Sequence, residues 1–228
     1  MKRFIGRLVL GLLLLVLLYQ AWLFVHVWWW VDHNPDSSAF MEDRLHVMQA
    51  KDSEAELRHQ WVPYSRISVN LKRAVIAAED AKFNDHEGFD WEGMQKAYEK
   101  NLKKGKIVAG GSTISQQLAK NLFLSSKRTP WRKLEEAVIT VMLEKMMSKR
   151  RILEIYLNVI EWGNGIFGAE AAARHYYKSS AAALGVEQAA RLAAMVPNPR
   201  YYDRHQTARG LARKTGIIAM RMNSAEVP

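Results

Sequence analysis

The sequence predicts a mainly α-helical domain that follows one membrane-spanning helix. Two observations carry this prediction. Nearly every segment after Ser53 repeats its apolar residues at helical spacing, and few stretches alternate apolar and polar residues as strands do. An uncharged, strongly apolar run extends from Leu8 to Val31 near the N-terminus. No internal repeat or low-complexity segment points to a different architecture.

The apolar run has the length and the flanks of a transmembrane helix. Residues 8–31 would make roughly 36 Å of helix, which exceeds the ~30 Å of a bilayer's hydrocarbon core. Three tryptophans, Trp28–Trp30, lie at its far end, where an aromatic belt is expected. Lys2, Arg3 and Arg7 precede the run, so residues 1–7 are expected in the cytoplasm and everything after Val31 outside the membrane. A buried helix of a soluble protein fits this length and these flanks less well.

Composition restricts the partners of the remaining chain. The sequence has 228 residues, no cysteine and a net charge of +10. Residues 32–50 are predicted to be a polar tether and residues 51–228 one extracytoplasmic domain. A basic domain beside a membrane attracts anionic headgroups or a phosphate-bearing substrate. No nucleic-acid partner is expected, because the domain is predicted to be extracytoplasmic and the sequence contains no nucleic-acid-binding motif.

Helical periodicity divides the predicted domain into eight segments. They are separated by glycine-rich or proline-containing breaks, such as Lys103–Gly111, Gly163–Gly168 and Pro197–Pro199. The expected helices are Leu71–Phe83, Trp91–Lys103, Thr113–Leu124, Trp131–Met147, Ser148–Asn158, Gly168–Tyr177, Val186–Met195 and Gln206–Met222.

The first candidate site is the end of the helix predicted at 71–83. Glu79 continues the apolar stripe of Leu71 and Val75, so burial would raise the pKa of its carboxyl and suit it to proton transfer. An ordinary helix end with solvated charges is an equal alternative on spacing alone. A hard cation could also bind the nearby cluster of Asp80, Asp85, His86 and Asp90.

The second candidate site follows a Gly-Gly turn at Gly110. Thr113 and Gln116 have the spacing of a capping box, which predicts a helix start. Backbone N–H groups at that start, together with Lys120, could hold an anion. On spacing alone, a capped helix with a solvated lysine is the better interpretation.

The third candidate site is the basic stretch from Lys127 to Ala137. Arg128, Arg132 and Lys133 crowd this segment, and Glu135 and Glu136 oppose them. These cations could neutralise a pyrophosphate while a carboxylate orients them. Arg132 and Glu136, four residues apart, could instead be a surface ion pair worth a few tenths of a kcal/mol.

Four motifs in order resemble glycosyltransferase family 51. EDAKFNDHEGFD resembles the family's ED-x-x-F-x-x-H-x-G motif, and GGSTISQQLAKN, RKLEEA and KRRILEIYLN resemble the next three. The resemblance covers roughly residues 60–202. It implies a lysozyme-like helical domain with a smaller, membrane-associated lobe. It also implies a peptidoglycan glycosyltransferase that polymerises lipid II into β-1,4-linked glycan with inversion, releasing undecaprenyl pyrophosphate.

The resemblance also assigns roles to residues. Glu79 matches the general base and Glu136 the second essential glutamate. Lys120 and Arg128 match the cations that stabilise the leaving diphosphate. Further positions around the cleft match as substrate-binding or supporting residues: Thr113, Gln117, Arg132, Lys133, Asp80, Phe83 and His86. No metal ligand is firmly assigned and no cofactor is expected to be obligatory, although Mg²⁺ or Mn²⁺ assists some members.

Other expectations concern location, partners and competing functions. The resemblance implies the inner (plasma) membrane, with the catalytic domain in the periplasm, and cell-wall synthesis or division proteins as partners. The chain stops at Pro228, so no transpeptidase activity is expected. Glu161 is a third carboxylate, which we interpret as structural. The competing functions are a lysozyme-like hydrolase or lytic transglycosylase, whose leaving group would not need Lys120 and Arg128, and a non-enzymatic binder of cell-wall precursors.

Overall fold

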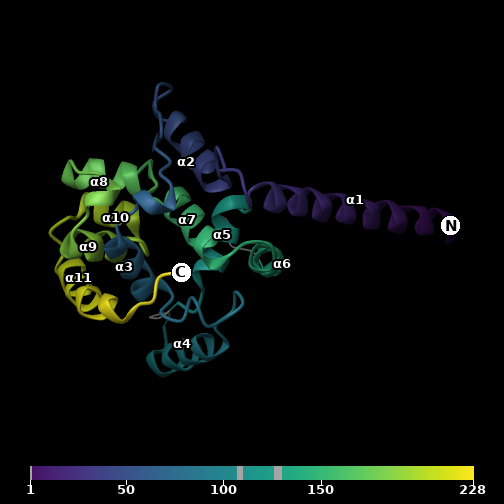
Figure 1. Cartoon of the computed structure of the whole chain (residues 1–228). Coiled ribbons are helices and arrows are strands. Elements are labelled where there is room, and N and C mark those ends of the chain that lie inside the picture. The colour runs from purple at the N-terminus through teal and green to yellow at the C-terminus, as the bar shows by residue number, and fades with distance from the viewer. Residues whose placement is uncertain (1, 107–109, 126–129) are drawn as a thin grey trace. The chain divides into compact units, whose positions relative to one another are not determined.

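The computed structural model describes residues 2–106, 110–125 and 130–228. They form two compact units, Met1–Pro35 and Asp36–Pro228. Both units are built mainly from helices, and the described strands are short (Figure 1). The prediction of a mainly α protein is therefore confirmed.

The first unit contains a single long helix, α1 (Lys2–Trp29). Among the described residues it is the one helix long and apolar enough to cross a membrane, with a mean hydropathy of 2.5. Its 28 residues extend about 42 Å. The helix begins earlier than the apolar run at Leu8, so the basic residues Arg3 and Arg7 belong to its first turns.

The second unit combines ten helices with a small sheet in the described residues. The helices are α2 (Ala39–Gln49), α3 (Val69–Glu79), α4 (Trp91–Lys104), α5 (Ile114–Phe123), α6 (Pro130–Met146), α7 (Lys149–Val159), α8 (Ala169–Tyr177), α9 (Val186–Met195), α10 (Pro199–Arg204) and α11 (Arg209–Arg221). The strands are β1 (Arg58–His59), β2 (Glu161–Gly163) and β3 (Ile166–Phe167), and the 3₁₀ turns are Tyr64–Arg66, Ala181–Ala183 and Met222–Ser224. The sheet order is β1-β3-β2, with β1 parallel and β2 antiparallel to β3.

Helix α7 forms the centre of the domain. Every residue from Ile155 to Val159 is buried, as expected for a helix that is covered on all sides. It packs against α5, α6 and α8, while α3, α9 and α11 form a second group of mutually packed helices. The ends of α3, α5 and α7 then meet at the candidate site, as described below.

Most helix ends lie within three residues of the predicted ones, but the end of α3, the tether and the unpredicted helix α10 differ more. Helix α3 ends at Glu79 rather than Phe83, because Asp80 leaves the helical conformation with φ −161°. Phe83 is nevertheless fully buried, since a turn carries it back into the core. The residues predicted as a tether include helix α2, which begins where the Ser38 side chain accepts a hydrogen bond from Met41 N–H. Helix α2 belongs to the second compact unit, which starts at Asp36.

Candidate active site

Glu79 is the last residue of α3, and its carboxyl group lies among polar side chains of the protein. Gln117 of α5 donates a hydrogen bond from Nε2 to Glu79 Oε2 at 2.9 Å, and Tyr156 of α7 donates its hydroxyl to Gln117 Oε1, also at 2.9 Å. Burial raises the pKa of Glu79, and the Gln117 hydrogen bond, Lys214 and Lys120 only partly oppose that shift. Such a carboxyl is a better proton acceptor than an ordinary glutamate.

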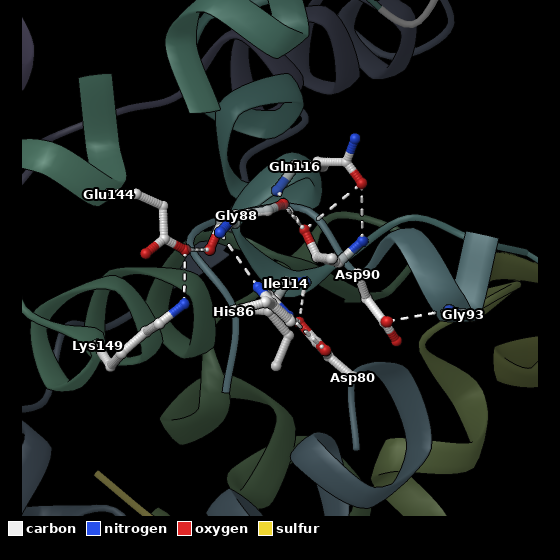
Figure 2. A network of polar contacts seen from close by, with 11 residues as sticks. Asp80, His86, Gly88, Asp90, Gly93, Ile114, Gln116, Glu144 and Lys149 are labelled. Atoms are coloured by element: carbon white, nitrogen blue, oxygen red, sulfur yellow. Dashed lines mark hydrogen bonds and ion pairs between the residues drawn. The ribbon is translucent and has the colours of Figure 1, made fainter. Parts of the chain in front are cut away.

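Asp80 connects the end of α3 to the start of α5. Its carboxylate accepts a hydrogen bond from His86 Nε2 at 2.9 Å and another from the backbone N–H of Ile114 at 2.9 Å (Figure 2). The Nδ1 atom of His86 accepts from Gly88 N–H at 3.1 Å, so the ring proton lies on Nε2. Asp80 is only 7% exposed, and this network fixes its neighbour Glu79 relative to α5.

Several polar groups in the first turn of α5 bond to other parts of the protein. The Thr113 hydroxyl donates to Gly88 O at 2.7 Å, and Thr113 and Gln116 form the predicted capping box. The N–H groups of Ile114 and Gln116 bond to Asp80 and Thr113. Two of the N–H groups that the predicted anion site would use are therefore engaged by protein, and the geometry favours a supporting role for Thr113.

A second buried carboxylate, Glu144 of α6, ties three helices together behind this turn. Glu144 accepts hydrogen bonds from the Ser115 hydroxyl of α5 and, at 2.8 Å, from Lys149 of α7 (Figure 2). The Lys149 ammonium also lies 4.7 Å from the centre of the Phe83 ring. Gly88, with φ +88°, packs so closely that a Cβ there would lie 2.7 Å from Thr140. Phe83 and His86 thus support the loop that follows Glu79.

A cleft of about 470 Å³ lies in this region of the described residues. Its lining includes seven residues that carry polar or charged groups from α5, α6 and α7: Gln117, Lys120, Asn121, Arg132, Lys133, Glu136 and Tyr156. Burial lowers the pKa of Lys120, and the carboxylate of Glu136 is the main opposing influence. Lys120 is therefore not the solvated lysine of the simpler interpretation.

Glu136 holds the cationic side of this cleft. The residue is 3% exposed, and its two carboxylate oxygens lie against Lys133 and, at 3.5 Å, Arg132. A half-exposed Lys133 and a mostly buried Arg132 are thus ordered by one carboxylate. The pair is not the fully solvated surface ion pair that the spacing also allowed. Arg128, predicted to act beside them, lies outside the described residues.

Glu79 and Glu136 border neighbouring cavities. Glu79 lines two smaller spaces, of about 170 and 240 Å³, while Glu136 lines the 470 Å³ cleft. Gln117 connects them, because it lines the larger cleft and donates to Glu79. The structure therefore brings Glu79, Gln117, Lys120 and Glu136 into one region.

The cation site suggested by Asp80, Asp85, His86 and Asp90 is not supported. Asp80 and His86 bond to each other, and Asp90 caps α4 by accepting from Gly93 N–H at 2.9 Å. No group of three or more His, Cys, Asp or Glu side chains suited to a metal ion occurs in the described part of the chain.

Two residues of the site were missed at the sequence level. Tyr156 lies in the helix predicted at Ser148–Asn158 and was given no role there, although its hydroxyl orients Gln117. Its single polar atom on a buried stripe was the available signal. Lys214 of α11 acts on Glu79 through its charge and lines the same 240 Å³ cavity. Nothing in the local sequence pattern relates it to Glu79.

Comparison with known proteins agrees with the motifs. A family model described as Transglycosylase matches residues 45–223. A biosynthetic peptidoglycan transglycosylase of Methylobacillus flagellatus is 73% identical over 100% of this chain and 99% of its own length. Proteins of the same name from Chromobacterium violaceum and Dechloromonas aromatica are 65% and 66% identical, covering 100% and 99% of this chain and 100% and 98% of their own lengths.

Proposed function

The chain belongs to the transglycosylase family, and from that membership we propose that it is a peptidoglycan glycosyltransferase that polymerises lipid II. The observation that carries the proposal is the arrangement of a desolvated carboxyl, Glu79, beside a cleft whose far side is cationic. The first group suits a proton acceptor and the second an anionic leaving group.

In the proposed reaction, Glu79 accepts the proton of the acceptor's 4-hydroxyl as that oxygen attacks C1 of the donor sugar. The new O4–C1 bond forms on the face opposite the leaving group, so the α-linked donor becomes a β-1,4 link. The bond from C1 to the diphosphate oxygen breaks, and undecaprenyl pyrophosphate departs with the bonding electrons. Gln117, held by Tyr156, orients the Glu79 carboxylate for this transfer.

The cationic side of the cleft serves the departing diphosphate. Lys120, Arg132 and Lys133 border the same cavity, and Glu136 fixes the last two. In a partly desolvated cleft their attraction for developing negative charge exceeds its value in water. We include Arg128 in this set on the motif alone. A divalent cation, Mg²⁺ or Mn²⁺, would be held by the diphosphate oxygens, since the described cleft carboxylates are engaged by cations.

The proposed location is the inner membrane, with α1 as a single span, the N-terminus in the cytoplasm and the catalytic domain in the periplasm. The length of α1 and the basic residues before its apolar run support this orientation. A lipid-linked substrate requires the cleft to work near a membrane surface. Partner proteins would come from cell-wall synthesis or division.

The test is polymerisation of fluorescent lipid II by the full chain in detergent, beside Glu79→Gln. We expect glycan ladders from the wild type and a loss of about 10²–10⁴ in rate from the variant. Glu87→Gln is the matched control, because Glu87 lies in the same loop but is exposed. Preformed glycan, added in a parallel assay, should stay intact. Shortening of that glycan without polymer formation would instead establish a hydrolase or lytic enzyme.

The requirement for a divalent cation is tested in the same assay by chelation. We expect activity to persist with EDTA and to rise moderately on adding Mg²⁺ or Mn²⁺. Complete loss of activity with EDTA, restored by metal, would show an obligatory ion.

A further inference from the structure

Helix α2 reaches the cleft through Phe40. Phe40 borders the 470 Å³ cavity together with Lys120 and Glu136. Its ring centre lies 5.7 Å from the Lys120 ammonium, within the range of a cation–π contact. The family model matches from residue 45 onward, so Phe40 precedes the matched region.

An ion pair fixes α2 to the strand β2. Arg44 Nε lies 2.9 Å from Glu161 Oε1, and the two side chains are only 13% and 11% exposed. The other oxygen of Glu161 lies 3.6 Å from Arg200 Nε of α10, and Gly165 N–H donates to Oε1 at 3.3 Å. Removing one member of such a buried pair leaves the other charge uncompensated, which is costly. Glu161 itself lines the cleft.

A glycine provides the second attachment of α2. Gly165, in the turn between β2 and β3, has φ +72°, a conformation that other residues rarely adopt. A Cβ at this position would lie 2.7 Å from the Sδ atom of Met48, near the end of α2. The positive φ thus favours glycine in this turn, and the Met48 side chain of α2 packs directly against it.

We propose that α2 is a wall of the catalytic cleft, positioned by the Arg44–Glu161 ion pair and the Met48–Gly165 contact so that Phe40 lies against bound substrate beside Lys120. Phe40 is then a substrate-contacting residue, and Arg44 and Glu161 are positioning residues. The ring excludes water from one side of the Lys120 ammonium, which strengthens its attraction for a diphosphate. The identity of the ligand rests on the proposed function, and the position of α2 does not.

The first test uses the absence of cysteine from the chain. Phe40→Cys and the matched control Glu42→Cys, an exposed position on the same helix, are made in the full chain carrying Glu79→Gln. The rate of thiol modification is measured with and without lipid II in detergent. We expect lipid II to slow modification at position 40 several-fold and to leave position 42 unchanged. Equal rates at position 40 with and without lipid II would overturn the proposal.

The polymerisation assay of the wild type distinguishes a failure of this inference from a failure of the proposed function. If the wild type makes polymer and position 40 is not protected, only the role of α2 fails. If the wild type makes no polymer and position 40 is not protected, the proposed function and this inference both fail.

The second test is a double-mutant cycle on the ion pair. Arg44→Gln, Glu161→Gln and the double variant are compared for KM and kcat. We expect each single variant to raise KM several-fold with a smaller change in kcat, and the double variant to be no worse than either single one. The control is Arg174→Gln, which breaks the Arg174–Glu170 ion pair (2.7 Å). Neither residue lines the cleft, so this variant should leave both constants unchanged. Strictly additive effects, or equal losses in Arg174→Gln, would contradict the positioning role.

Discussion

Glu79 and Glu136 are both largely enclosed by protein, but their partners differ in kind. Glu79 accepts one hydrogen bond from a neutral amide, Gln117, and burial raises its pKa. Glu136 is 3% exposed and lies against two cations, Arg132 and Lys133. Both groups lose much of their hydration, although Glu79 is the more accessible of the two, and their neighbours differ in charge. A neutral partner suits Glu79 to exchanging a proton, whereas the contacts of Glu136 with two cations suit it to ordering them.

The largest expected effect that separates Glu79 from Glu136 is on the rate of polymerisation. Glu136→Gln should lower kcat/KM by about 10²–10³, because Arg132 and Lys133 lose the carboxylate that aims them at the leaving diphosphate. The residual activity should still fall at low pH, because Glu79 remains the base. The measurement is a pH profile of lipid II polymerisation by the variant. A profile without an acid limb would mean that Glu136, not Glu79, is the titrating base.

The next effect concerns the pKa of Glu79 itself. A base acts when deprotonated, so wild-type kcat/KM should fall as the pH drops through the raised pKa of Glu79, above the ordinary glutamate range. Gln117→Leu removes the hydrogen bond that opposes this rise, so its acid limb should move to still higher pH. Tyr156→Phe, which keeps the Gln117 donor, should move the limb less. A limb that stays in place in Gln117→Leu would argue against the direct contact.

A third prediction concerns the scaffold behind Glu79. Asp80→Asn replaces one accepting oxygen by a donor, so either His86 or the Ile114 N–H loses its partner. We expect a loss of about 1–3 kcal/mol in the free energy of unfolding. Thermal unfolding of the full chain in detergent measures it, at about 2–4 °C for each kcal/mol. Asp85→Asn is the control, because Asp85 is exposed in the same loop. Equal melting temperatures would show that the network does not stabilise the loop.

The smallest expected effect contrasts the two glutamates in stability. The folded protein holds the proton of Glu79 more tightly than the unfolded chain does, so wild-type stability falls as the pH rises through the raised pKa. Glu79→Gln removes this loss and should match or exceed the wild-type melting temperature at pH 8, with the difference shrinking at acid pH. Glu136→Gln should be destabilised at pH 8, because it leaves two cations unpaired. A destabilised Glu79→Gln at pH 8 would contradict the difference between the two sites.

The helices were predictable because each carries its own local pattern. The spacing of Leu71, Val75 and Ala78 located α3, and Thr113 with Gln116 located the start of α5. The end of α3 was predicted too late. The Asp80 carboxylate accepts a hydrogen bond from the N–H of Ile114, a residue far along the chain, and this contact was not visible in the local pattern. Helix α2 was overlooked because its weak local pattern is stabilised by partners on distant elements, including Glu161 and Gly165.

The sequence by itself determined the helical class, the apolar N-terminal helix and the identity of the motif residues, because composition and period act over neighbouring positions. Only the tertiary structure decided that Gln117 and Tyr156 orient Glu79, that Lys214 faces it and that Phe40 lines the cleft. The sequence also did not distinguish Glu79 from Glu136, because both are simply glutamates at that level. The pKa of Glu79 depends on burial and on groups brought together from distant segments, and no local pattern records those distances.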